Sequence, residues 1–156
     1  MKNNKLYYLF KHSPRQSVKL SSYFDSYSSL FQSYINKPIT FVEVGIYGGG
    51  SLHIWKKFFH PKSRIIGIDL NPDSKKYEKF GYEIHIGDQE NSLFWKKFYK
   101  KVGKVDILLD DGGHTDSQQI QTLVSSIKNI KKKGKIIIED THASYLTEFG
   151  NPSNTS

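Results

Sequence analysis

From residue 40 onward, short β-branched apolar runs alternate with stretches of helical periodicity. This alternation is typical of a parallel sheet built from βαβ units. Most of the runs are apolar on both faces, which predicts strands buried between two layers of helices. Five strands are expected, beginning at Thr40 (TFVEV), Arg64 (RIIGID), Tyr82 (YEIHI), Val105 (VDILLD) and Lys135 (KIIIED). The predicted fold is α/β and Rossmann-like, with strand order 3-2-1-4-5 and helices on both faces.

The helices are predicted from apolar residues that recur at helical spacing. Leu52, Trp55 and Phe59 share one face. A later helix should turn a stripe toward the core, formed by Ile120, Leu123, Val124, Ile127 and Ile130. Before the first strand, another apolar face should pack on the sheet edge or cover the pocket; it comprises Leu20, Phe24, Tyr27, Phe31, Tyr34 and Ile35.

The chain has 156 residues and 37% hydrophobic content, enough for one ordinary core. We divide it into an N-terminal helical segment (1–39), a sheet domain (40–150) and a polar tail (151–156). A doubly wound sheet normally continues past its fifth strand, but no apolar strand follows here. The domain is therefore expected to be cut short after the fifth strand.

The net charge of +8 would suit a nucleic-acid partner. The lysines, however, fall in pairs and triplets at the edges of apolar segments, as on solvated helix faces, so we expect no specific nucleic acid. The sequence has no cysteine, which excludes disulfides and thiolate metal sites. It also has no long apolar run and no signal-peptide pattern, so we expect a cytoplasmic protein without membrane contact.

The first predicted strand runs into a glycine-rich loop, FVEVGIYGGGSL, in which Ser51 opens a helix. Glycines allow a sharp turn and bring backbone amides close to a ligand, although a plain tight turn is the alternative. Dinucleotide enzymes seat a pyrophosphate on such a turn. The carboxylate of Glu43 would repel a pyrophosphate and suits an ammonium or sulfonium group, which disfavours a hydride-transferring dehydrogenase.

Two further acids follow at predicted strand ends. Asp69 lies 20 residues after Gly49, at the tip of the second strand, where an acid accepts ribose hydroxyls. Asp88 closes the third strand. It either positions an adenine or caps the next helix, and both interpretations stay open.

These residues resemble a known family. The pattern Glu43-x-Gly45-x-x-x-Gly49, then Asp69, then Gly87-Asp88-Gln89 is similar to the first three motifs of class I S-adenosylmethionine-dependent methyltransferases. The resemblance implies that the glycine loop holds the methionine part of the cofactor, Asp69 the ribose, and Asp88 with Gln89 the adenine. We assign to the cofactor site Glu43, Gly45, Tyr47, Gly49, Ser51, Asp69, Asp88, Gln89 and Asp110.

A second acidic cluster follows the last two strands, which end LLDDGGHTD and IIIEDTHASY. In the order 3-2-1-4-5 these strands are neighbours about 4.8 Å apart, so Asp111, Glu139 and Asp140 should converge. Three carboxylates repel one another unless a cation neutralises them. Oxygen ligands favour Mg²⁺, with Mn²⁺ or Ca²⁺ as competitors. His114 follows two glycines, and an imidazole takes a hydroxyl proton readily near neutral pH.

The segments DDGGH and IIIEDTHASY, followed by EFG, resemble the macrocin and mycinamicin sugar O-methyltransferase group, in which a magnesium ion orients a sugar diol. The resemblance runs from about Phe41 to Gly150. It implies that Asp111, Glu139 and Asp140 are metal ligands and that His114 is the general base. The chain departs from the group by lacking a large N-terminal region and by stopping where acceptor-binding segments would follow.

The resemblance implies S-adenosylmethionine-dependent, metal-assisted O-methylation of a small-molecule hydroxyl, such as a sugar of an antibiotic or surface polysaccharide. A nucleic-acid methyltransferase is the alternative suggested by the charge, but an Asn-Pro-Pro-Tyr-like tetrapeptide is missing. A non-enzymatic module, or a fragment without activity of its own, also stays open. The sequence also leaves open whether the protein forms a homo-oligomer.

Overall fold

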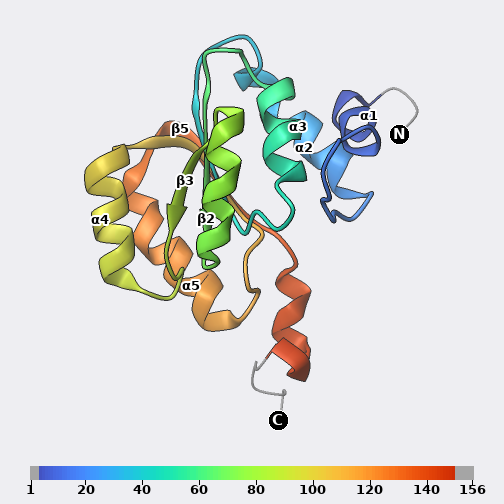
Figure 1. Ribbon diagram of the computed structural model, residues 1–156. Coiled ribbons are helices and arrows are strands. Elements are labelled where there is room, and N and C mark those ends of the chain that lie inside the picture. Colours follow the sequence, from blue (N-terminus) through green and yellow to red (C-terminus); the bar gives the residue numbers. More distant parts are fainter. Residues whose placement is uncertain (1–3, 150–156) are drawn as a thin grey trace.

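The computed structural model of the chain describes residues 4–149, and the polar tail predicted at 151–156 lies outside them. Five parallel strands form one sheet with the order β3-β2-β1-β4-β5 (Figure 1). The strands are β1 (Thr40–Val44), β2 (Arg64–Asp69), β3 (Glu83–Ile86), β4 (Val105–Asp110) and β5 (Ile130–Ile138). The α-helices are α1 (Lys5–Lys11), α2 (Tyr23–Phe31), α3 (Gly50–Phe58), α4 (Ser92–Val102) and α5 (Asp116–Ser126). Within 4–149, no helix is long and apolar enough to cross a bilayer.

Short 3-10 helices complete the connections. They are η1 (Gln32–Tyr34), η2 (Pro72–Phe80), η3 (Ile127–Asn129), η4 (Thr141–Tyr145) and η5 (Thr147–Phe149). Two of them, η4 and η5, follow β5, and His142 in η4 is exposed.

The predicted strand order is confirmed. β1 lies at the centre and pairs in parallel with β2 and β4, so that Glu43 sits opposite Gly67 on one side and Leu109 on the other. Because all five strands run in the same direction, their carboxyl ends meet at one edge of the sheet. That edge carries the residues that the sequence singled out.

The fifth strand starts earlier than expected. β5 begins at Ile130, which pairs with Val105, and the register then shifts so that Lys135 pairs with Ile107. The extra residues between these pairs form a bulge in which Lys133 adopts a positive φ of 69°. The bulge leaves the three consecutive lysines at 131–133 exposed, while Ile130 and Ile136 still pack on the sheet.

Helices cover both faces of the sheet, as predicted. Side chains on one face, including Phe41 and Leu109, pack with α1, α2 and α3. Side chains on the other face, including Val42 and Leu108, pack with the aromatic residues of α4. Figure 1 shows α1, α2 and α3 together on one side and α4 with α5 on the other. The alternation follows from the period of two along each strand.

Helix α2, in the N-terminal segment, packs into the hydrophobic core on the face of the sheet that includes Phe41 and Leu109. Phe24, Tyr27 and Phe31 are almost fully buried, and the ring of Tyr27 packs edge-on against Trp55 of α3. The predicted apolar face therefore exists, except that Leu20 precedes the helix and is 51% exposed. The Tyr27 hydroxyl also donates to Glu139, so α2 lies close to the end of β5.

The predicted orientation of α5 is wrong. Its apolar stripe faces solvent, with Ile120 60%, Val124 65% and Leu123 39% exposed, and Ile127, which follows in η3, is 61% exposed. The buried positions are instead polar, namely Gln119, Thr122 and Ser126. Gln119 donates a hydrogen bond to the carbonyl oxygen of Glu139, and Thr122 accepts one from Gln89. These hydrogen bonds to the strand ends set the rotation of the helix, which periodicity alone did not reveal.

Candidate active site

A cleft opens at the carboxyl ends of the strands. It consists of two adjoining cavities of about 350 and 260 Å³, which share Gly45, Tyr47, Asp111 and Gly112 in their walls. The larger cavity extends to the ends of β2 and β3 and includes Asp69, Asp88 and Gln89. The smaller cavity extends to Ser17, Val18, Ser51, His114 and Asp140. The glycine loop thus stands between a region that contains Asp69 and Asp88 and a region that contains Asp111, His114 and Asp140.

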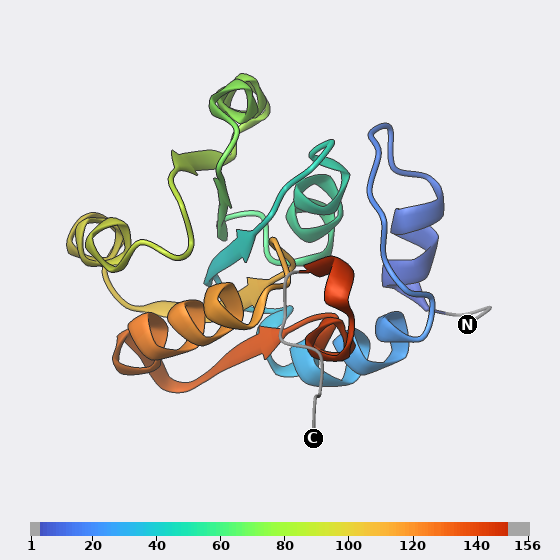
Figure 2. The same ribbon diagram turned by 90° about the horizontal axis from the view of Figure 1, so that it is seen from below.

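The glycine loop lies directly against the end of β4. Gly45 has a positive φ of 77°, and a Cβ atom there would lie 2.1 Å from the carbonyl oxygen of Asp111. Only glycine fits this position. On its other side the loop meets the N-terminal segment, because the Gly50 amide donates to the carbonyl oxygen of Gln16 at 3.0 Å. Figure 2 shows this segment running beside the loop that follows β1.

Glu43 is fully buried beneath the loop. Its Oε2 accepts a hydrogen bond from the Ser51 hydroxyl at 2.7 Å, and its Oε1 lies 3.3 Å from Nζ of Lys19. Burial raises the pKa of Glu43, and the nearby Lys19 opposes this. The sequence predicted that the Glu43 carboxylate would pair with an ammonium or sulfonium group of a ligand. In the structure it pairs instead with the ammonium of Lys19. Ser51 does line the smaller cavity.

Asp69 is held in a fixed orientation at the end of β2. Its Oδ2 accepts from the Ile46 amide at 3.1 Å, and its Oδ1 accepts from the Asn71 amide at 2.8 Å. Each oxygen keeps a further lone pair for a ligand in the larger cavity. Asp88 is exposed on the same wall, where its Oδ1 accepts from the Glu90 amide.

Gln89 and Asp110 form a buried polar pair. The Gln89 side-chain amide donates to both oxygens of Asp110 at 3.2 Å, and its own oxygen accepts from the Gly113 amide. Burial raises the pKa of Asp110. Asp110 is not among the described residues that line either cavity. The pair instead ties the end of β4 to the turn that begins α4, where the Trp95 indole donates to the Gln89 carbonyl.

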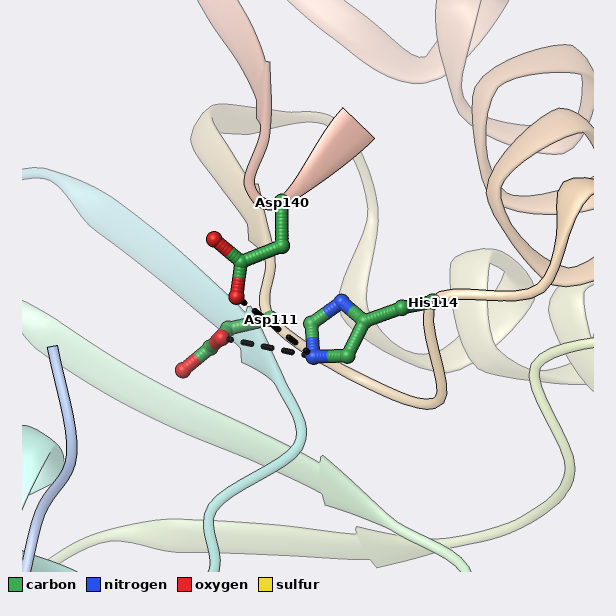
Figure 3. A group of neighbouring side chains, drawn as sticks. All are labelled: Asp111, His114 and Asp140. Carbon is green, nitrogen blue, oxygen red and sulfur yellow. Dashed lines mark ion pairs between the residues drawn. The ribbon is translucent and has the colours of Figure 1, made fainter. Parts of the chain in front are cut away.

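Asp111, His114 and Asp140 come together at the smaller cavity (Figure 3). Among the described residues, these three offer ligand atoms that all lie within 4.8 Å of one another. Nε2 of His114 is 3.9 Å from Oδ1 of Asp111 and 3.9 Å from Oδ2 of Asp140. Both His114 and Asp140 have positive φ values, 63° and 53°, which is a strained conformation for non-glycine residues. The turns after β4 and β5 therefore place these side chains at the same cavity.

Glu139 is next to this group in sequence, but its Oε1 is directed elsewhere. That oxygen accepts from Nζ of Lys19 at 2.7 Å and from the hydroxyl of Tyr27. Burial raises the pKa of Glu139 to about 7, while Lys19 pulls it down. For Lys19, burial alone would lower the pKa, but the attraction of Glu43, Glu139 and Asp111 together raises it, so the ammonium stays charged.

Three residues of the N-terminal segment contact the acidic cluster and were not predicted as site residues. Lys19 bonds Asp111 and Glu139, Tyr27 bonds Glu139, and Tyr23 donates to Oδ1 of Asp140 at 2.6 Å. A tyrosine on a buried helix face needs a partner for its hydroxyl, and that signal was available for Tyr27. Lys19 lies in an irregular connection between α1 and α2, and no sequence pattern marks it.

Comparison with known proteins identifies relatives of this arrangement. No protein-family model matches the chain. It is 29% identical over 131 residues to the mycinamicin VI 2''-O-methyltransferase of Micromonospora griseorubida, and 30% identical over 135 residues to the demethylmacrocin O-methyltransferase of Streptomyces fradiae. These alignments cover 80% and 82% of the chain.

A solved structure of the MycE methyltransferase of the mycinamycin pathway, in complex with Mg and SAH, superposes with a TM-score of 0.82. It covers 95% of this chain at 26% identity. The chain has a class I methyltransferase fold. Its homologues are sugar O-methyltransferases of the macrocin and mycinamicin group. The methyltransferase domain described here spans about a third of the length of these curated relatives, and 42% of the MycE chain.

Proposed function

We propose that this chain carries the cofactor and metal site of an S-adenosylmethionine-dependent, divalent-metal-assisted O-methyltransferase that acts on a sugar hydroxyl. The observation that carries the proposal is the convergence of Asp111, His114 and Asp140 on the cavity that also borders the glycine loop. A methyl acceptor at this place would lie beside both a bound cofactor and a bound cation. The names of the curated relatives, which are O-methyltransferases of glycosylated antibiotics, support the same reaction class.

The larger cavity fits the nucleoside part of the cofactor. Asp69 offers two oriented carboxylate oxygens for ribose hydroxyls, and Asp88 stands at the far end on the side expected for the adenine. Gly45 and Tyr47 line both cavities and so would border the methionine part. Gln89 lines this cavity and fixes the turn at Gly113, whereas Asp110 would act from behind the wall through its hydrogen bond with Gln89.

The smaller cavity fits a hard divalent cation. Oδ1 of Asp111 and Oδ2 of Asp140 face the same space, and carboxylate oxygens are ligands that Mg²⁺ and Mn²⁺ accept. Glu139 stays a predicted ligand, and only its Oε2 remains for a metal because Lys19 and Tyr27 hold Oε1. A bound divalent ion would supply positive charge that orients the acceptor hydroxyl and makes it more acidic.

His114 is the proposed general base. Its Nε2 lies 3.9 Å from each of the two aspartates, which is too long for a hydrogen bond and leaves the atom able to take a proton. S-adenosylmethionine supplies an activated methyl group. Nε2 of His114 would take the proton that the acceptor hydroxyl loses when it receives this methyl group. Most of the rate enhancement would come from holding the two reactants in line.

The acceptor is proposed from the relatives, since MycE was also solved with Mg, SAH and mycinamycin VI. The test is methyl transfer from isotopically labelled S-adenosylmethionine to a panel of glycosides and nucleotide-linked sugars, with Mg²⁺ and with a chelator. Transfer that requires the metal, and that falls by roughly 10²–10⁴-fold in His114→Ala, is the expected result. Transfer that is indifferent to chelation would contradict metal assistance, and transfer that is indifferent to His114→Ala would remove the proposed base.

A further inference from the structure

A lysine from the N-terminal segment is buried among the ends of three strands. The side chain of Lys19 is only 2% exposed. Its Nζ lies 2.6 Å from Oδ2 of Asp111, 2.7 Å from Oε1 of Glu139 and 3.3 Å from Oε1 of Glu43. Lysine is almost never buried unless it is paired. Here one ammonium is shared by carboxylates that belong to β1 and to the ends of β4 and β5.

The ammonium divides the acidic cluster into two parts. It takes Oδ2 of Asp111 and Oε1 of Glu139, which leaves Oδ1 of Asp111 turned toward His114 and Asp140. The inner part consists of Glu43, Oε1 of Glu139 and Oδ2 of Asp111, and it already holds the positive charge of Lys19. The outer part lines the smaller cavity and has partly exposed aspartates. Asp111 belongs to both parts, so the position of its outer oxygen depends on the bond that Lys19 makes to its inner oxygen.

Removal of one member of a buried group of charges leaves the others uncompensated. If Lys19 were absent, no cation would lie between the carboxylates of Glu43, Asp111 and Glu139. Carboxylate oxygens gathered in this way would attract a divalent ion into the space that the ammonium now fills. The adjacent residues Ser17 and Val18 form part of the cavity wall, so the same bonds also hold that wall in place.

We infer that Lys19 is a positioning residue whose ammonium serves as a built-in cation at the ends of β1, β4 and β5. It holds Asp111 with one oxygen free for the proposed metal and keeps a divalent ion out of the inner part of the cluster. The inference rests on the proposed function only in so far as it concerns the divalent ion at the smaller cavity. The inner cation role is a property of the contacts of Lys19 itself.

The test is a titration with Mn²⁺, followed by calorimetry and by electron paramagnetic resonance, on the whole chain and three variants. Lys19→Met removes the charge and keeps much of the side-chain volume. Lys19→Met with Glu139→Gln removes one negative charge along with the positive one. Lys62→Met is the matched control, because Lys62 is exposed. The thermal melting temperature of each protein is measured with and without Mn²⁺.

Lys19→Met is expected to bind one more Mn²⁺ than the wild type, or to bind its ion about tenfold or more tightly. Its melting temperature should fall without metal and recover in Mn²⁺, whereas the double variant should lose the added Mn²⁺ binding. Lys62→Met should match the wild type. If Lys19→Met does not fold without metal, folding in the presence of Mn²⁺ supplies the same result, and failure to fold in both conditions overturns the inference.

The inference is also overturned if Lys19→Met keeps the wild-type stoichiometry and affinity and melts lower by the same amount with and without Mn²⁺. That result would describe a merely structural lysine. Mn²⁺ binding by Lys19→Met but not by the wild type would support the inner cation role and contradict the proposed metal-assisted function. Binding by neither protein would contradict both.

Discussion

The Tyr23 hydroxyl donates a hydrogen bond to Oδ1 of Asp140 at 2.6 Å and accepts one from the Asp140 backbone amide at 3.3 Å. Tyr23 begins α2, whereas Asp140 follows β5, and 117 residues separate them. Burial and the adjacent carboxylate raise the pKa of Tyr23 to about 12, so the hydroxyl stays a donor. The N-terminal segment thereby fixes the orientation of a proposed metal ligand, and it leaves the other oxygen of Asp140 turned toward His114.

Tyr23→Phe should weaken Mg²⁺ binding by roughly 10–100-fold, because outer partners of metal ligands typically contribute that much to metal affinity. Calorimetric titration of the purified protein with Mg²⁺ measures the change. Tyr8→Phe is the control, since Tyr8 is 62% exposed. Equal Mg²⁺ affinity in Tyr23→Phe and the control would show that Asp140 does not depend on this hydrogen bond as a ligand.

Gly45→Ala should destabilise the fold by about 2 kcal/mol or more, because the new methyl group would collide with backbone and the residue would keep a positive φ. Gly81→Ala is a matched comparison. Gly81 also has a positive φ, of 82°, but a Cβ there would meet nothing within 4 Å. Its cost should be limited to about 1 kcal/mol of backbone strain. Urea denaturation of both variants measures the difference, and equal losses would mean that the loop can move away from β4.

The stability of the metal-free protein should depend on pH through Glu139. Burial, opposed by Lys19, raises its pKa from 4.5 to about 7, so the folded state binds this proton more tightly than the unfolded state does. The stabilising contribution is therefore complete below pH 4.5 and is lost as the pH rises through about 7. Relative to Glu139→Gln, the wild type should lose about 2 kcal/mol of unfolding free energy between pH 4.5 and pH 8.

Denaturation curves of both proteins across this range, with chelator present, provide the measurement. Glu139→Gln is the suitable reference because an amide resembles the protonated acid in shape and does not titrate. A constant difference between the two proteins at all pH values would mean that Glu139 titrates at its ordinary pKa.

Because the apolar stripe of α5 is exposed, shortening a side chain there should reduce the unfolding free energy much less than shortening a buried side chain of the sheet. Val124→Ser should change the unfolding free energy by no more than about 0.5 kcal/mol, since Val124 is 65% exposed. Leu108→Ala, at a fully buried position of β4, should cost about 2–5 kcal/mol. Thermal and urea unfolding compare the two variants, and a large loss from Val124→Ser would indicate that the stripe is covered in solution.

Much of the fold could be predicted because the strands are marked by local apolar runs. The edge of the sheet that gathers Asp69, Asp111 and Asp140 followed from the strand order alone. The rotation of α5 could not be predicted, because the hydrogen bond that Gln119 donates to Glu139 and the one that Thr122 accepts from Gln89 outweigh the exposure of its apolar stripe. The bulge of β5 was missed because three lysines interrupt the apolar run after Ile130.

The electrostatics of the site were only partly predictable. The sequence indicated that clustered carboxylates need a cation, and a metal was expected. In the structure part of that charge comes from Lys19, 120 residues before Glu139, in a segment without regular periodicity. Residues this far apart in the sequence, both in irregular segments, give no local pattern that predicts their contact. The contact forms only when α2 packs against the sheet.

We propose that one cleft holds a methyl donor beside a divalent cation bound by Asp111 and Asp140. The most direct test is calorimetric titration of the protein with Mg²⁺ in the presence of S-adenosylhomocysteine, together with Asp111→Asn and Asp140→Asn. We expect the wild type to bind Mg²⁺, both variants to lose this binding, and their affinity for S-adenosylhomocysteine to stay within about threefold of wild type. Mg²⁺ binding that survives both substitutions, or its absence from the wild type, would contradict the claim.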